Sequence, residues 1–289
     1  MKAPMRFAKY NLNFPNLCNG QAAVANRTGV IVEYEGGYGC IQSWPELGDD
    51  PLESHLEALQ QGKPTEMGQA CLNCCKIDGQ ARRNRINLIS KILVRPSHRL
   101  ITNINSIEVI TGKLRTLNQG DLIKIKGTSN LDETLEAVEC IAQSFRIRID
   151  FNACLTLPRF RQFLGGLTDH ARRQIEFIED PFPYDADQWM EVSLEFDVRL
   201  ALDWGSADAL AGFAVRIWKP ARQLNPPAGN LYCITHNMDH GIGRAYATYQ
   251  ASLFKGDLLA CGLGDISPCE EDIGLGYSKE LELLEWETL

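Results

Sequence analysis

After residue 120 the sequence alternates between strand-like and helix-like segments, and this alternation constrains the fold more than any other feature. Apolar runs rich in β-branched residues, typical of strands, occupy residues 121–127, 146–152, 174–181, 196–205, 213–220, 230–237 and 257–264. Helical spacing of apolar residues occurs between several of them, at residues 131–145, 157–167, 206–212 and 242–254. Alternation of this kind favours parallel strands joined by crossovers. We therefore predict an α/β fold, a compact (β/α)7β TIM-like barrel.

The earlier part of the chain has a different pattern, which predicts an N-terminal α+β domain. Residues 29–39 indicate a strand, a Gly-Gly turn and a second short strand. Residues 51–62 begin a helical region in which leucines recur at helical spacing. We place this domain at residues 1–97 and the barrel catalytic domain at residues 98–265. The C-terminal segment, residues 266–289, is expected to pack back onto the N-terminal domain.

Composition and charge exclude several classes of protein. Of the 289 residues, 44% are hydrophobic and 23% are charged, as in an ordinary globular protein. The net charge of −8 provides no basic surface for nucleic acid. No apolar run approaches the roughly 18 residues of a membrane helix, and the first residues lack the apolar stretch of a secretory signal. We expect a cytoplasmic protein that binds neither nucleic acid nor membrane, either as a monomer or as a homo-oligomer.

One cysteine cluster, CLNCCK, lies in a segment with helical spacing. Cys71, Cys74 and Cys75 are not accompanied by a second pair of Cys or His residues at the spacing of a zinc site. A reduced cysteine packs like a small apolar residue, and cytoplasmic cysteines stay reduced. We predict that these three residues form the buried face of a helix rather than a metal site.

Most of the predicted barrel strands end in polar side chains. These are Lys124, Lys126, Asp150, Asn152, Glu179, Asp180, Asp203, Lys219, His236 and Asn237. In a barrel the carboxyl ends of the strands meet at one face, where catalytic groups sit. A single Asp at such a position usually caps the next helix, and lysines that alternate along an exposed strand serve only solubility. The recurrence over five successive strands favours one shared site.

The predicted site combines three carboxylates with two flanking lysines. Asp150, Glu179 and Asp203 would supply hard oxygen ligands, which favour Mg²⁺ or Mn²⁺ over zinc. Lys126 and Lys219 would flank the ion from opposite sides of the barrel. A lysine beside a divalent cation and a second ammonium group has a lowered pKa and can act as a base. Such a base next to a metal ion is suited to removing a proton alpha to a carboxylate, so we predict a small-molecule carboxylate substrate.

In this ordered set of residues the sequence resembles the enolase superfamily, in its muconate-lactonizing-enzyme-like branch. The motifs that carry the resemblance are KIK (Lys124, Lys126), IDFN (Asp150), IEDP (Glu179), LALD (Asp203) and WKP (Lys219). Residues 1–97 would then be a capping domain over the barrel mouth. Within the branch, the segments GYGCIQSWPELGD and DHGIG are most similar to the o-succinylbenzoate synthases.

This resemblance implies a carbon–oxygen lyase of menaquinone biosynthesis. The reaction would be the syn dehydration of 2-succinyl-6-hydroxy-2,4-cyclohexadiene-1-carboxylate to 2-succinylbenzoate, through an enediolate stabilised by Mg²⁺. Lys126 would remove the alpha proton and then protonate the departing hydroxyl. Lys219 would stay charged beside the intermediate, and Lys124 would support the base and contact the substrate carboxylate.

The resemblance also implies supporting roles for other residues. Thr235 and Asp239 are candidates for substrate binding, and Asn152 and Asp180 for holding the metal ligands in place by hydrogen bonds. Family members close their barrel mouth with loops of the capping domain, and residues 17–28 are the candidate lid.

Two other functions stay open on the sequence alone. An N-succinylamino acid racemase or dipeptide epimerase of the same superfamily would use Lys126 and Lys219 as opposed bases. A non-catalytic scaffold could keep the barrel without the chemistry, but it would have no need of three carboxylates able to bind a metal ion.

Overall fold

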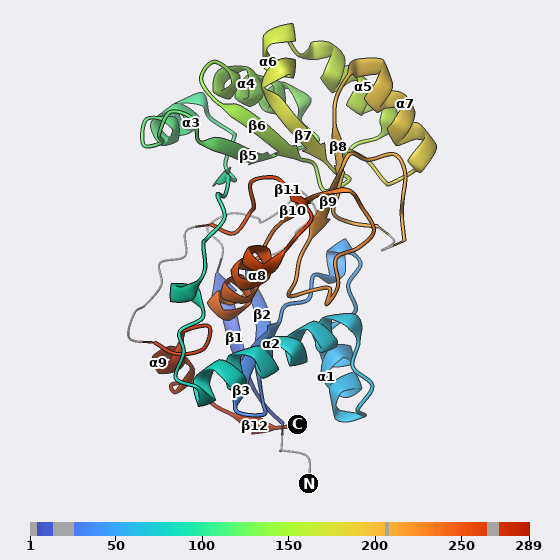
Figure 1. Ribbon diagram of the computed structural model, residues 1–289. Helices are drawn as coiled ribbons and strands as arrows, with labels where there is room; N and C mark the ends of the chain where they lie inside the picture. Colours follow the sequence, from blue (N-terminus) through green and yellow to red (C-terminus); the bar gives the residue numbers. More distant parts are fainter. Residues whose placement is uncertain (1–4, 14–25, 206–207, 265–271) are drawn as a thin grey trace.

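The computed structural model describes residues 5–13, 26–205, 208–264 and 272–289. Its N-terminal part is an antiparallel sheet that two helices cover (Figure 1). In spatial order the strands are β12 (Glu287–Thr288), β1 (Arg6–Asn13), β2 (Asn26–Tyr34) and β3 (Gly37–Ile41). The helices are α1 (Leu52–Gln60) and α2 (Glu66–Arg83). In the sequence, the short 3-10 helix η1 (Pro45–Leu47) lies between β3 and α1.

The two ends of the chain meet in this sheet. Phe7 of β1 pairs with Glu287 of β12, so the last described residues lie beside the first. A short helix, α9 (Ser278–Leu281), precedes β12. The domain limits at residues 97 and 265 stay predictions.

The strand, turn and strand predicted for residues 29–39 are confirmed by β2 and β3. Glu35 and Gly36, which join these strands, both have positive φ angles (54° and 75°), as tight hairpin turns require. Glycine in β3 also allows α2 to approach closely, because a Cβ at Gly37 would lie 2.1 Å from the carbonyl oxygen of Cys75.

The prediction for the cysteine cluster is also confirmed. Cys71, Cys74 and Cys75 lie on the buried face of α2, at 2% exposure or less. Thr65 begins this helix, and its side-chain oxygen accepts a hydrogen bond from the backbone of Gly68, which satisfies one of the free N–H groups of the first turn.

The second part of the chain is an eight-stranded parallel sheet. In spatial and sequence order its strands are β4 (Arg99–Ile101), β5 (Leu122–Lys126), β6 (Arg146–Asp150), β7 (Ile175–Glu179), β8 (Leu200–Leu202), β9 (Val215–Trp218), β10 (Leu231–Ile234) and β11 (Asp257–Leu258). The sheet closes on itself, because Ser97 before β4 bridges Cys261 after β11. The backbone N–H of His98 donates to the carbonyl of Cys261 across this seam, at 2.9 Å. The predicted barrel is therefore confirmed.

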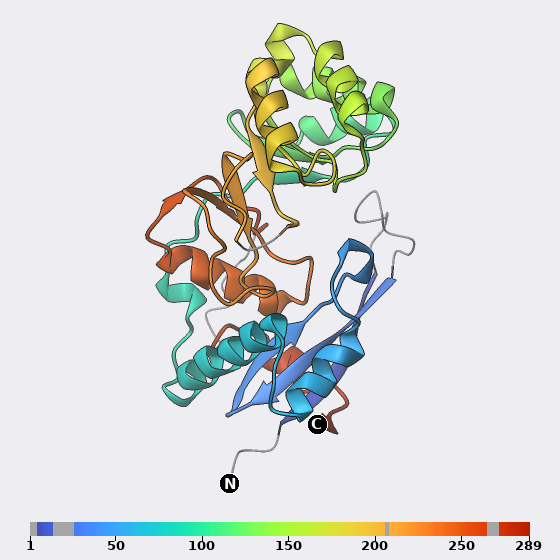
Figure 2. The ribbon, with the colours of Figure 1, turned by 90° about the vertical axis from the view of Figure 1, so that its right-hand side faces the viewer.

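The helical cover of the barrel is uneven (Figures 1 and 2). The helices are α3 (Ile107–Leu114), α4 (Leu131–Ala142), α5 (Leu157–Gly166), α6 (Asp169–Gln174), α7 (Ala186–Phe196) and α8 (Gly241–Leu253). In the described residues no helix follows β8 or β9. The fold therefore departs from the helix predicted for residues 206–212, because residues 208–212 contain no helix.

The reason for this departure is a close contact with α7. The hydroxyl of Tyr184 donates to the carbonyl of Ala211 at 2.8 Å. Gly212 has a positive φ of 78°, and a Cβ there would lie 2.6 Å from the carbonyl oxygen of Ala186. The strand predicted for residues 196–205 is shorter in the structure. Helix α7 extends to Phe196, and only Leu200–Leu202 pair in the sheet.

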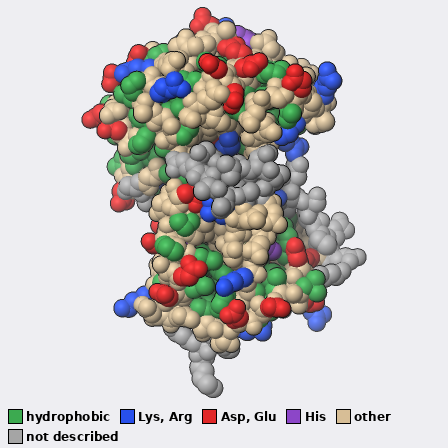
Figure 3. Space-filling model, turned by 180° about the vertical axis from the view of Figure 1, so that it is seen from behind, with side chains coloured by type: hydrophobic (Ala, Val, Ile, Leu, Met, Phe, Trp, Pro, Cys, Tyr) green, Lys and Arg blue, Asp and Glu red, His purple; other side chains and the backbone are tan. Residues whose placement is uncertain are grey.

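The last barrel helix joins the two parts of the molecule. α8 lies between the barrel and the antiparallel sheet (Figure 1), where Ile242, Ala245 and Tyr246 pack with Ile31 and Cys40. Acidic and basic side chains are interspersed on the face seen in Figure 3, without a large area of one sign. None of the described helices is both long and apolar enough to span a bilayer.

Candidate active site

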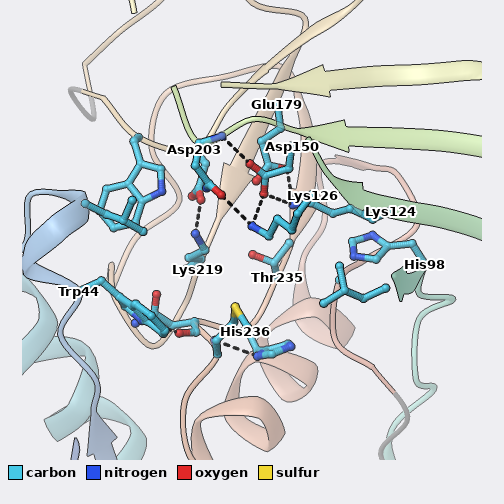
Figure 4. Close-up of a pocket in the computed structure, with 17 residues that line it drawn as sticks. Trp44, His98, Lys124, Lys126, Asp150, Glu179, Asp203, Lys219, Thr235 and His236 are labelled. Carbon is cyan, nitrogen blue, oxygen red and sulfur yellow. Dashed lines mark hydrogen bonds and ion pairs between the residues drawn. The ribbon is translucent and has the colours of Figure 1, made fainter. Parts of the chain in front are cut away.

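One pocket at the carboxyl ends of the barrel strands collects most of the predicted site residues (Figure 4). It holds about 600 Å³, its open mouth included. The predicted residues that line it are Lys124, Lys126, Asp150, Asn152, Glu179, Asp203, Lys219, Thr235, His236 and Asn237. The lining residues not assigned from the sequence are Trp44, Leu47, His98, Leu100, Trp204, Met238 and Gly262.

The register of three adjacent strands brings the central groups together. Lys126 at the end of β5 pairs with Asp150 of β6, which pairs in turn with Glu179 of β7. Since side chains alternate along a strand, Lys124 and Lys126 point to the same side of the sheet. Parallel pairing in register therefore places two lysines and two carboxylates at one level of the barrel.

The lysines hold the carboxylates by direct ion pairs. The Nζ atom of Lys124 lies 2.9 Å from Asp150 Oδ2 and 2.7 Å from Glu179 Oε2. The Nζ atom of Lys126 lies 2.6 Å from the same oxygen of Asp150 and 3.2 Å from Asn152 Oδ1. On the other side of the pocket, Lys219 pairs with Asp203. All three lysines are largely buried, so these pairs are shielded from solvent.

Burial and mutual charge set the protonation of this cluster. Burial alone would lower the pKa of Lys124, but the carboxylates of Asp150 and Glu179 outweigh it and raise that pKa. Burial opposes ionisation of Asp150 as well, yet its two lysines hold its pKa well below the ordinary value. Burial and then the charge of Asp150 raise the pKa of Glu179 to about 7. Asp150 and Glu179 therefore differ in protonation although they share Lys124.

Two residues behind the cluster fix its backbone. The carboxylate of Asp180 accepts hydrogen bonds from the backbone N–H groups of Asp203 and Trp204, both at 3.1 Å. The N–H of Asn152 donates to Asp150 Oδ1 at 3.0 Å. Asn152 and Asp180 both have positive φ angles (47° and 40°), an uncommon backbone for non-glycine residues that is often found at functional sites.

The three carboxylates of the pocket are the candidate ligands of a metal ion. No three His, Cys, Asp or Glu side chains within the described ranges are arranged to hold a metal ion, and lysine ammonium groups contact Asp150, Glu179 and Asp203. The donors nevertheless fit Mg²⁺ chemically: they are buried carboxylates at neighbouring strand ends. Binding would exchange lysine–carboxylate pairs for ion–carboxylate contacts.

The N-terminal domain completes the pocket. Trp44 and Leu47, at and within η1, form part of its wall. The indole Nε1 of Trp44 donates to the carbonyl of Asn237 at 3.0 Å, and Asn237 Nδ2 donates to the carbonyl of Gln42 at 2.8 Å. Arg222 of the barrel pairs with Asp49 at 2.8 Å. Residues 42–49 are thus bound to the loops after β9 and β10.

An aromatic side chain lies beside Lys219. The Nζ atom of this lysine is 5.2 Å from the ring centroid of Trp204, and the guanidinium carbon of Arg222 is 3.8 Å from the same centroid. Two cations therefore lie near one indole ring, which favours positive charge at this wall of the pocket.

The two predicted substrate-binding residues have different positions. Thr235 lines the pocket, and its Oγ1 is buried without a hydrogen-bond partner among the described residues. Asp239 is not among the lining residues; its Oδ2 lies 3.8 Å from Cys40 Sγ, at the contact between the domains. The role predicted for Asp239 therefore gains no support. Most of the candidate lid, residues 17–25, lies outside the described residues, and residues 26–28 belong to β2.

Sequence reasoning missed His98, which lies at the pocket wall beside Lys124 (Figure 4). It precedes the three-residue strand β4, whose length gives no pattern. Trp44 and Leu47 were also missed, because nothing in their local sequence indicates which part of the barrel their segment meets.

Comparison with known proteins shows similarity to o-succinylbenzoate synthases in sequence. The family model for the N-terminal domain of o-succinylbenzoate synthase matches residues 5–81. An o-succinylbenzoate synthase of Bdellovibrio bacteriovorus is 28% identical, over 98% of this chain and 98% of its own length.

Solved structures share the fold. The N-succinyl Arg/Lys racemase of Bacillus cereus matches with a TM-score of 0.79 at 15% identity, over 100% of both chains. A mandelate racemase/muconate lactonizing protein of Herpetosiphon aurantiacus matches with a TM-score of 0.76 at 15% identity, over 95% of this chain and 97% of its own. The dipeptide epimerase of Methylococcus capsulatus matches with a TM-score of 0.74 at 17% identity, over 96% and 99%. The chain is therefore similar in sequence to o-succinylbenzoate synthase over almost its whole length, and it shares its fold with racemase, epimerase and muconate lactonizing proteins.

Proposed function

We propose that this enzyme is an o-succinylbenzoate synthase, which dehydrates 2-succinyl-6-hydroxy-2,4-cyclohexadiene-1-carboxylate to 2-succinylbenzoate. The observation that supports the proposal most is the grouping of Lys124, Lys126 and Lys219 with three carboxylates around one pocket. The similarity to the Bdellovibrio enzyme over almost the whole of both chains supports the choice of this reaction within the superfamily.

In this proposal Lys126 is the base. Its Nζ atom is held by Asp150 and Asn152 at the floor of the pocket, where the neutral amine would take the proton alpha to the substrate carboxylate. The same ammonium group would then give a proton to the departing hydroxyl. A C–H and a C–O bond break, a ring double bond forms, and water leaves, which makes the ring aromatic. One group acting on both bonds requires that they lie on the same face of the ring.

The other two lysines would act through their charge. Lys124, whose pKa is raised by Asp150 and Glu179 after the opposing effect of burial, would stay protonated beside Lys126 and the substrate carboxylate. Lys219, next to Trp204, would stabilise the negative charge that develops on the opposite side of the ring. Asp180 and Asn152 would keep Asp203 and Asp150 in place.

Asp150, Glu179 and Asp203 are the residues that would hold Mg²⁺, or Mn²⁺ in its place. When bound, the ion would supply positive charge to the substrate carboxylate as the alpha proton leaves. We place the reaction in menaquinone biosynthesis in the cytoplasm. The described cysteines are free thiols, which suits a reducing compartment.

An absorbance assay of the cyclohexadiene carboxylate tests the proposal. Aromatisation should require Mg²⁺, stop when a chelator is added, and be lost in Lys126→Ala. A folded wild-type protein that binds Mg²⁺ without turning over this substrate would refute the assignment.

A second candidate is an N-succinylamino acid racemase or dipeptide epimerase. It is favoured by the origin of Lys126 and Lys219, which lie at the ends of β5 and β9, four positions apart in the closed sheet, as two opposed bases would need. The fold match to the racemase of Bacillus cereus also favours it. Deuterium exchange at the alpha carbon of N-succinyl-arginine in D₂O would reveal it. Lys219→Arg separates the candidates, since a charge stabiliser tolerates arginine and a second base does not.

A further inference from the structure

His98 is a buried pocket residue that the proposed mechanism does not use. It is 8% exposed and lies at the seam that closes the barrel, where its backbone N–H donates to Cys261. Its ring forms part of the pocket wall beside Lys124 (Figure 4). Its position on the backbone is thus fixed, and its chemistry depends on which ring nitrogen carries a proton.

Arg148 determines which ring nitrogen of His98 carries the proton. The Nη1 atom of Arg148 lies 2.9 Å from Nδ1 of His98. A guanidinium group can only donate hydrogen bonds, so Nδ1 must accept and carries no proton. Burial, followed by the charges of Lys124 and Arg148, lowers the pKa of His98 well below its ordinary value. The ring is therefore neutral, and its single proton is on Nε2.

Arg148 itself has little freedom to move. Its side chain is fully buried inside the barrel, its Nε donates to Glu176 Oε2 at 2.6 Å, and its Nη1 also donates to the carbonyl of Ala260 at 2.7 Å. The guanidinium carbon lies 4.6 Å from the ring centroid of Phe177. The donor that faces His98 is thus held from several sides.

The other edge of the His98 ring lies against a glycine. A Cβ at Gly262 would lie 2.7 Å from His98 Cε1 and 3.0 Å from Nε2, and 2.8 Å from Thr235 Cγ2. Gly262 therefore leaves open the part of the wall that His98 and Thr235 share. Among the hydrogen bonds of the described residues, Nε2 of His98 donates to none, and Thr235 Oγ1 is buried and unpartnered.

We propose that His98 Nε2–H is a neutral hydrogen-bond donor, held in one tautomer by Arg148, that binds an oxygen of the substrate's succinyl arm. This inference rests on the proposed function for the identity of the arm. His98 lies beside Lys124, whereas Asp203 and Lys219 follow β8 and β9, across the closed sheet from β4. The ring carboxylate would bind among the lysines and the metal ligands. An uncharged donor beside Thr235 supplies the second contact, which gives the arm a fixed direction.

The tautomer of the His98 ring can be measured in the absence of substrate. Nitrogen-15 NMR of the whole chain with labelled histidine should show His98 as the neutral Nε2–H form at pH 7, identified by the loss of its signals in His98→Asn. The product 2-succinylbenzoate should shift the Nε2–H proton signal, and benzoate, which lacks the arm, should not. A protonated Nδ1, or equal shifts with both ligands, would overturn the proposal.

Kinetics of two variants test the donor. His98→Asn keeps an acceptor near Arg148 but cannot reach the pocket, whereas His98→Gln can place an amide N–H near the position of Nε2. We expect KM to rise about tenfold in His98→Asn with kcat within about threefold, and His98→Gln to remain within about threefold of wild type in both. His170→Asn, a histidine of α6 that contacts Ala142 outside the pocket, is the control.

Equal impairment of both variants, or an unchanged KM in His98→Asn, would exclude a donor role. If the wild-type protein does not turn over the cyclohexadiene carboxylate, the proposed function fails, whereas the ligand-free tautomer is still measured. A neutral Nε2–H form with no response to 2-succinylbenzoate would overturn the assignment of the arm.

Discussion

The two halves of the barrel are built differently. From β5 to β7 the strands are five residues long and helices α4 to α7 cover them. From β8 to β10 the strands have three or four residues, and the described connections between them contain no helix. The first half supplies Lys126, Asp150 and Glu179, whereas the second half supplies Asp203 and Lys219 and receives the N-terminal domain.

The two halves of the barrel therefore have different roles in the site. The helix-covered half holds the base and its carboxylates on strands whose register is fixed along their length. The loops of the other half contact the N-terminal domain through Arg222 and Asn237. The barrel thus loses regularity on the side where the pocket is completed by a second domain.

The largest expected effect is on catalysis in the helix-covered half. Lys126→Ala should lower kcat/KM by about a thousandfold or more, because the proposed base is removed. Arg222→Ala, on the opposite half, should lower it by less than about tenfold. Steady-state assays of the two variants measure this contrast. Similar losses of kcat/KM in both would mean that catalysis does not depend mainly on the helix-covered half.

The next effect is on stability. Phe160 of α5 is fully buried and packs edge-on against Phe151, with ring centroids 6.3 Å apart. Phe160→Ala should lower the free energy of unfolding by about 3–5 kcal/mol. Urea titration followed by circular dichroism measures this. A loss below about 1 kcal/mol would show that the first half is not the more tightly packed part of the barrel.

The third effect concerns buried carboxylates, which also differ between the halves. Asp150 lies between two lysines, whereas Asp239, after β10, has no hydrogen-bond partner for Oδ1 in the described structure. Burial raises the pKa of Asp239 to about 7. The folded protein then holds a proton that the unfolded chain releases near pH 4, so stability should fall as pH rises from about 4 to about 7.

Asp239→Asn should remove this part of the pH dependence and raise stability at pH 7 more than at pH 4. Thermal melts of both proteins between pH 4 and pH 8 give the comparison. Parallel profiles for the two proteins would show that Asp239 titrates normally in the folded state.

The smallest expected effect is at the ion pair that joins the N-terminal domain to the barrel. Asp49→Asn weakens the ion pair with Arg222, which is partly exposed, so the stability loss should be below about 1 kcal/mol. KM should still rise a few fold, because residues 42–49 carry the pocket residues Trp44 and Leu47. Glu191→Gln, whose side chain pairs with Arg161 on the exposed face of α7, should change neither quantity. An unchanged KM in Asp49→Asn would remove the link between this contact and the pocket.

Periodicity predicted the barrel well where strands are long and helices amphipathic, as at β6 and α4. It failed where tertiary contacts override local pattern, as at residues 208–212, which lie against α7. The site was found in part because charged residues recur at successive strand ends. His98 and Trp44 could not be found this way. His98 precedes a short strand, and Trp44 lies in a loop of the other domain, so no local spacing of residues indicates that either reaches the pocket.

The chain crosses between its domains twice. It leaves the antiparallel sheet after α2 to enter β4, and it returns from β11 to place β12 beside β1. Two connections restrict the rotation of one part against the other more than a single linker would. Together with the contacts of residues 42–49 to the barrel, they keep Trp44 and Leu47 in one position at the pocket wall.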